Sequence, residues 1–184
     1  MILKKYIDIE PYDNKSAQAM SALLTALHRS FDEVGGFALA FPRIRSNENP
    51  WVGGVIRVFM SSSEGIEKLV ELLEKNSLVA NKVRFMFAKS IPDNFKGDWV
   101  NYSRVRVPSL SDVEKSRTNK AKARETRLSS SNTVPYFRLL SKSTGQLFSL
   151  MVVAKKTAPF GGEVFPTSYG LSSENRPFSV PEIK

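Results

Sequence analysis

The chain contains one histidine, His28, and no cysteine, which narrows the chemistry that its side chains can perform. Without cysteine there is no disulfide, no thiolate zinc site and no cysteine nucleophile. One histidine and scattered carboxylates are a poor set of metal ligands, so we expect neither a metal nor another cofactor. Histidine titrates close to neutral pH and is suited to accept a proton. A half-buried structural histidine at the edge of a helix remains the alternative.

Cleavage of RNA is one reaction that a single histidine can assist without a metal. RNA carries its own nucleophile, the 2′-hydroxyl, so its cleavage requires a proton acceptor, an in-line geometry and donors near the phosphate. Lys and Arg outnumber Asp and Glu by 27 to 18, and the resulting charge of +9 suits a phosphate-rich partner. The composition therefore favours a nucleic acid as the partner.

Residues 141–148, SKSTGQLF, gather polar side chains between the apolar runs YFRLL and SLMVV, a pattern that predicts the tip of a β-hairpin. Gly145 can adopt the positive φ that a tight turn needs. The polar side chains are those of Ser141, Ser143, Thr144 and Gln146. Such residues are common in any turn, but they could also face ribose and phosphate where Gly145 lets the backbone approach.

Residues 110–128, LSDVEKSRTNKAKARETRL, predict a helix with one cationic face. Arg117, Lys120, Arg124 and Arg127 step by 3, 4 and 3 residues. They therefore fall within roughly an 80° arc of the helix. Lys115 and Lys122 lie on the far side. The helix has too little apolar surface to bind a membrane, and its charge favours phosphate over a merely solvated face.

Hydrophobic periodicity predicts the elements that position these groups. Strands are expected over 2–10, 37–41, 54–60 and 82–89, and helices over 16–33 and 64–75. The order β-α-β-β-α-β is typical of a ferredoxin-like, RRM-like domain. We expect an α+β protein in which this domain spans 1–92. A smaller domain over 93–184 would begin with a strand over 99–107 and hold the basic helix and the hairpin.

No apolar run is long enough to cross a membrane, and no secretory leader is present. We therefore expect a cytoplasmic protein without a membrane partner.

Four features in order resemble the CRISPR repeat-processing endoribonucleases of the type I-F system. They are a histidine within LLTALH, SRVRV (103–107) before the basic helix, S-x-STGQ-x-F (141–148) and TSYGLS (167–172). The resemblance implies cleavage of a repeat stem-loop in pre-crRNA at the 3′ base of its hairpin. It implies a 2′,3′-cyclic phosphate and a 5′-hydroxyl as products, and a protein that stays on the crRNA with the other subunits of the surveillance complex.

The resemblance also implies roles for single residues. His28 would accept the proton, Ser141 would hold the 2′-hydroxyl, and Tyr169 would orient the histidine or the scissile region. Phe148 would stack on the closing base pair, and Arg104 would read a guanine near the stem base. The remaining RNA contacts expected are Arg106, Lys115, Arg117, Lys120, Lys122, Arg124, Arg127, Ser143, Thr144 and Gln146.

Position 106 carries Arg106 where the family has glutamine, so base reading there would shift to guanine or to a phosphate contact. Two other classes stay open. In a non-catalytic stem-loop-binding module of the same fold, His28 would be structural and the basic helix would hold RNA. A ribosomal or assembly protein would share the same charge.

Overall fold

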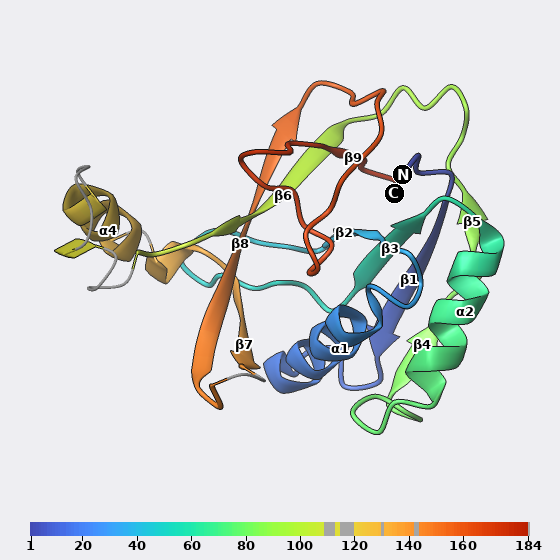
Figure 1. The fold of residues 1–184 in the computed structure, drawn as a ribbon, viewed down its shortest axis with the longest axis horizontal. Helices are drawn as coiled ribbons and strands as arrows, with labels where there is room; N and C mark the ends of the chain where they lie inside the picture. Colours follow the sequence, from blue (N-terminus) through green and yellow to red (C-terminus); the bar gives the residue numbers. More distant parts are fainter. Residues whose placement is uncertain (109–112, 115–119, 130, 142–143, 184) are drawn as a thin grey trace.

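The computed structural model describes residues 1–108, 113–114, 120–129, 131–141 and 144–183. The protein is α+β, with two antiparallel sheets, as the sequence predicted (Figure 1). The helices in the described residues are α1 (Ala17–Ser30), α2 (Ser63–Glu74), α4 (Lys120–Ser129) and a short 3₁₀ turn (Ser131–Thr133). None of these helices is long and apolar enough to span a membrane.

The first sheet contains the strands predicted in the N-terminal half. They are β1 (Lys5–Pro11), β2 (Ala38–Ala40), β3 (Ile56–Met60), β4 (Val83–Phe85) and β5 (Lys89–Ser90), in the order β2-β3-β1-β4, with β5 also on β1. The strand predicted over 82–89 is interrupted: β4 and β5 each pair with β1, and residues 86–88 between them are not in strand conformation. Periodicity alone did not reveal this break.

Local capping explains where the two helices of this half begin. The Ser16 side chain accepts a hydrogen bond from Ala19 N, and the Ser62 side chain accepts one from Gly65 N. Helix α1 ends at Ser30, before the predicted Glu33, because the chain turns through Gly35 and Gly36 with φ of 76° and 90°. The ends of α2 match the predicted helix within one residue.

The second sheet has the order β7-β8-β6-β9. Its strands are β6 (Trp99–Val105), β7 (Tyr136–Leu140), β8 (Leu147–Thr157) and β9 (Val180–Pro181). The predicted hairpin is confirmed, with Leu140 opposite Leu147 at its tip. Strand β9, which pairs with Trp99 and Val100, was not predicted because two residues are too few to show alternation.

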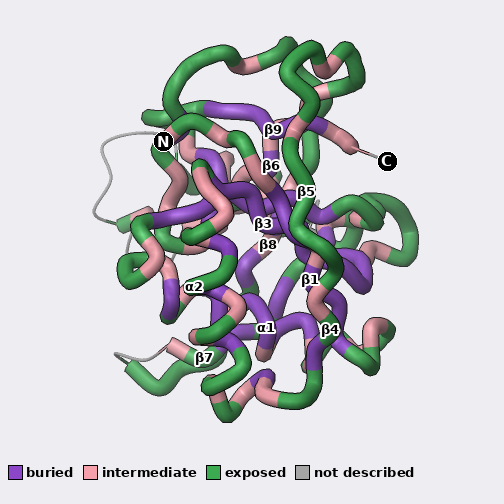
Figure 2. The backbone as a smooth tube through the Cα atoms, turned by 90° about the vertical axis from the view of Figure 1, so that its right-hand side faces the viewer, coloured by how far each residue is buried: buried purple, intermediate pink, exposed green. Residues whose placement is uncertain are grey.

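One apolar core joins the two sheets, and buried segments run through the centre of the molecule (Figure 2). The ring of Phe41 contacts those of Phe137 on β7 and Tyr102 on β6. Helix α1 packs on β7, whose Arg138 N donates to the Ser21 Oγ of the helix at 3.1 Å. The helix that carries His28 therefore has a defined position relative to the β7–β8 hairpin.

The predicted basic helix falls only partly within the described residues. Residues 113–114 are helical and α4 covers 120–129, whereas Lys115 and Arg117 lie outside the described part of the chain. Figure 1 shows α4 beyond the end of β6, away from the two sheets.

Arg57 on β3 ties the C-terminal segment to the first sheet. Its Nε and Nη2 donate to the two carboxylate oxygens of Asp8 at 2.6 and 2.8 Å, and its Nη1 donates to the Ile183 carbonyl. The Arg57 side chain is only 8% exposed, so these partners offset the free-energy cost of burying its charge.

We expect Asp8→Asn to lower the free energy of unfolding by about 3 kcal/mol, because it leaves a buried guanidinium without its counter-charge. Denaturant unfolding measures this change. The matched control is Glu71→Gln, which breaks the solvent-exposed Lys75–Glu71 pair and should leave the midpoint unchanged. Equal effects of the two variants would contradict the role assigned to Arg57.

Candidate functional site

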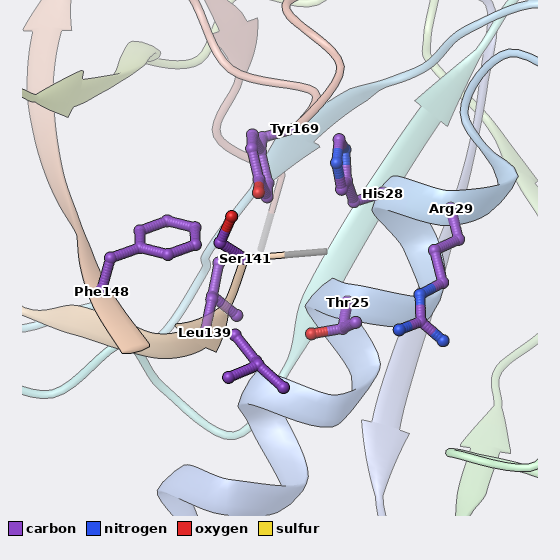
Figure 3. A pocket seen from close by; sticks show the side chains of 8 residues that line it. Thr25, His28, Arg29, Leu139, Ser141, Phe148 and Tyr169 are labelled. Atoms are coloured by element: carbon purple, nitrogen blue, oxygen red, sulfur yellow. The ribbon is translucent and has the colours of Figure 1, made fainter. Parts of the chain in front are cut away.

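A cavity of about 310 Å³ lies where α1, the β7–β8 hairpin and the 167–172 segment meet. Its lining residues are Thr25, His28, Arg29, Leu139, Leu140, Ser141, Phe148 and Tyr169 (Figure 3). Four side chains singled out in the sequence, His28, Ser141, Phe148 and Tyr169, thus share one cavity although they come from three separate segments.

The His28 ring is held from two sides. Its Nδ1 lies 2.9 Å from the carbonyl oxygen of Ser168. Because a carbonyl can only accept, Nδ1 carries the hydrogen in the neutral ring and Nε2 keeps a lone pair. The ring also stacks on Tyr169, with centroids 4.0 Å apart and planes 11° apart. Figure 3 shows the two rings face to face at the cavity. This arrangement provides a positioned proton acceptor.

Tyr169 is half-buried. Burial raises the pKa of Tyr169, and the nearby positive charge of Arg104 lowers it in part. The net shift is upward, so the phenol keeps its proton at neutral pH. Tyr169 can therefore donate a hydrogen bond or stack, but it does not supply a phenolate.

The turn that carries Tyr169 is fixed against β2. The Gly170 carbonyl accepts from Leu39 N at 2.8 Å, and Gly170 N donates to the Thr167 carbonyl at 2.7 Å. Gly170 has a φ of +70°, and a Cβ there would lie 2.5 Å from Leu39 Cγ and 3.1 Å from the Phe37 ring. Only glycine fits this turn without displacing the backbone that holds His28.

The hydroxyl groups at the hairpin tip shape the turn. Ser141 Oγ accepts from Thr144 N at 3.3 Å, and Thr144 Oγ1 accepts from Gln146 N at 3.4 Å. Gly145 has the positive φ of 65° that was expected. Ser141 also lines the cavity, whereas Thr144 and Gln146 are exposed and do not. Ser143 lies outside the described residues.

Arg104 lies beside the aromatic ring expected to stack on RNA. Its guanidinium carbon is 5.7 Å from the Phe148 centroid, a cation–π contact that joins β6 to β8. Desolvation lowers the pKa of Arg104, and the charge of Arg106 lowers it further. An arginine still remains charged in water at any ordinary pH. Arg104 and Phe148 therefore form a paired cationic and aromatic surface next to the cavity.

A second cavity, also of about 310 Å³, lies between α4 and the chain that leaves β6. Arg106, Lys120 and Arg127 supply its cations. The predicted cationic face is not wholly open to solvent. Arg124 donates to the Pro108 carbonyl and Arg127 donates to the Arg106 carbonyl, so two arginines attach α4 to the chain. Lys122 is exposed on α4 and lines neither cavity.

Sequence reasoning missed three contributors to the first cavity: Thr25, Arg29 and the Ser168 carbonyl. Thr25 precedes His28 by three residues and Arg29 by four, so helical periodicity could have placed Thr25 beside both of them. A backbone carbonyl gives no sequence signal. Among the residues that the structure describes, no three His, Cys, Asp or Glu side chains gather as a metal site requires.

We expect the neutral His28 of the wild type to show a single tautomer, with the hydrogen on Nδ1, because Ser168 accepts it. Gly170→Ala should move the turn and yield a mixture of both tautomers. Nitrogen NMR of the imidazole measures this directly, since the chain has only one histidine. Gly145→Ala is the matched control, because it also places alanine at positive φ but meets nothing within 4 Å. An unchanged tautomer in Gly170→Ala would refute this account of the turn.

A family model described as CRISPR-associated protein (Cas_Csy4) matches residues 6–182, which include both sheets, the cavity and α4. A search of curated proteins found no significant match.

Proposed function

The chain belongs to the Cas_Csy4 family of CRISPR-associated, type I-F proteins, and processing of CRISPR repeat RNA is the activity this implies. On that premise we propose that it is a metal-independent endoribonuclease that cuts the repeat stem-loop of pre-crRNA at the 3′ base of the hairpin. The observation that carries the proposal is the cavity in which His28, oriented by Ser168 and Tyr169, lies with Ser141.

In the proposed reaction, His28 Nε2 takes the proton of the 2′-hydroxyl on the nucleotide before the cut. The 2′-oxygen then attacks the adjacent phosphorus and forms a new P–O bond, while the P–O5′ bond breaks. The upstream fragment ends in a 2′,3′-cyclic phosphate, and the 5′-oxygen of the downstream fragment takes up a proton. Ser141 holds the 2′-oxygen, and the stacked ring of Tyr169 keeps the imidazole plane fixed.

Recognition of the stem is assigned to the residues around the cavity. Phe148 stacks on the closing base pair, and Arg104 contacts a guanine edge at the end of the stem, where the major groove is accessible. Their 5.7 Å contact supports placing both at the same base step. Thr144 and Gln146, at the tip of the β7–β8 hairpin, contact the RNA backbone. Ser143 joins them in the proposal by resemblance alone.

The phosphate backbone of the stem is assigned to the cationic group around α4. Arg106, Lys120 and Arg127, which line the second cavity, would contact phosphates, with Lys122 and Arg124 on the same helix. Lys115 and Arg117 belong to this group by their place in the sequence.

We further propose a ferredoxin-like domain over 1–92 and an RNA-binding domain over 93–184. The sheet order β2-β3-β1-β4, with α1 after β1 and α2 after β3, supports the first assignment. Retention of the product in a complex with other type I-F subunits is also part of the proposal.

The test is a denaturing gel of labelled repeat hairpin incubated with the protein in excess EDTA. We expect the wild type to cut the all-ribose RNA and to leave a substrate with one 2′-deoxy at the cut intact. His28→Ala should lower the single-turnover rate by about a hundredfold to ten-thousandfold, because it removes the proton acceptor, and should keep RNA affinity. Binding without cutting by every sample would favour the non-catalytic RNA-binding module.

The phosphate contacts of α4 predict a change in salt dependence. Lys120→Gln should weaken hairpin binding and reduce the slope of log affinity against log salt by about 1, because one fewer counterion is released. Filter binding over a salt series measures the slope. Lys75→Gln at the C-cap of α2 removes the same charge from a residue paired with Glu71 and should not alter the slope. Equal slopes for wild type and Lys120→Gln would remove Lys120 from the interface.

A further inference from the structure

Arg29 lines the first cavity but has no part in the reaction proposed above. It is an exposed residue in the last turn of α1. Within the part of the chain that the structure describes, its side chain makes no hydrogen bond and no ion pair. A cation in that turn stabilises the helix dipole wherever its side chain points. The helix dipole therefore does not explain why Arg29 lines the cavity that holds the proposed proton acceptor.

The cavity has two sides. Figure 3 shows the Arg29 guanidinium beside Thr25 on the α1 side, across the cavity from Phe148 and Ser141. In this view the rings of His28 and Tyr169 lie side by side at the top of the cavity. If the stem rests on Phe148 and the cut lies at His28, the nucleotide that follows the cut leaves toward α1.

The two side chains on the α1 side offer different chemistry. Thr25 Oγ1 donates its hydrogen to the Ser21 carbonyl at 2.8 Å, so it has only acceptor capacity left. It suits a ribose hydroxyl and not a phosphate. Arg29 is the only Lys or Arg among the eight lining residues, and its planar guanidinium matches phosphate oxygens.

We propose that Thr25 and Arg29 form a subsite for the nucleotide on the 3′ side of the cut. Arg29 binds the phosphate that follows this nucleotide, and Thr25 accepts from its ribose 2′-hydroxyl. The inference rests on the proposed function and adds a position for the downstream strand. The subsite is occupied in the substrate and vacated when the downstream fragment leaves, so it adds to the affinity for uncut RNA and not to that for the retained product.

The test compares two RNAs that the protein cannot cut. Both carry the hairpin with a 2′-deoxy nucleotide immediately before the cut. One RNA ends at that nucleotide, and the other continues for a few nucleotides beyond it. We expect the wild type to bind the extended RNA roughly tenfold more tightly, as one charge-assisted contact allows. Arg29→Gln should bring this ratio close to one. Lys15→Gln, just before the N-cap of α1, loses the same charge outside the cavity and should keep the ratio.

A second measurement probes the contact from the RNA side. A single neutral methylphosphonate at the phosphate after the downstream nucleotide should abolish the gain for the wild type and have no effect with Arg29→Gln. Because the methylphosphonate RNA can be tested with the wild-type protein alone, this measurement still tests the phosphate contact if Arg29→Gln does not fold.

The subsite would be overturned if the wild type bound both RNAs equally. It would also be overturned if Arg29→Gln kept the wild-type ratio, or if Lys15→Gln lost the ratio as fully as Arg29→Gln. Failure of the proposed function would appear separately, as a wild type that does not cut the all-ribose form of the extended RNA.

Discussion

The close packing of Gly170 against β2 is the constraint on which the rest of the candidate site depends. A backbone turn can lie on Leu39 and Phe37 only where there is no side chain, and a Cβ at this position would come within 2.5 Å of Leu39. The same turn presents the Ser168 carbonyl to His28 and the Tyr169 ring to the imidazole face. One contact between the first sheet and the C-terminal segment thus determines both the tautomer and the plane of the only histidine.

Helix α1 supplies the second half of this arrangement. Its apolar face is buried in the core, and Ser21 holds the β7 backbone through Arg138 N, which brings the hairpin with Ser141 and Phe148 to the His28 end of the helix. The proposed proton acceptor and the proposed 2′-hydroxyl partner therefore lie on elements that pack directly on one another. Such packing reduces the reorganisation that an in-line reaction requires.

The proposed cleavage chemistry and the proposed contacts to the stem phosphates involve different cavities. The cavity around His28 has Arg29 as its only Lys or Arg, whereas the cations of α4 line a separate cavity. Two α4 arginines donate to the carbonyls of Arg106 and Pro108, so they attach the helix to the chain as well as adding charge. Under the proposal, stem binding through α4 persists after the downstream nucleotide has left the first cavity. An enzyme of this design is expected to retain its product.

The sequence by itself determined the α+β class, the hairpin at 141–148 and most helix and strand positions, because these follow from local periodicity, capping residues and glycine. The residue set also singled out His28 as a candidate proton acceptor, and the ordered motifs identified the family that the comparison confirmed. Only the tertiary structure decided that His28 meets Ser168 and Tyr169, that Thr25 and Arg29 share its cavity, and that the strand over 82–89 is broken. It also decided that Arg124 and Arg127 of α4 donate hydrogen bonds to the backbone carbonyls of Pro108 and Arg106. The physical reason is that these features depend on contacts between residues distant in the chain and on backbone carbonyls, which are alike at every position and leave no pattern in the sequence.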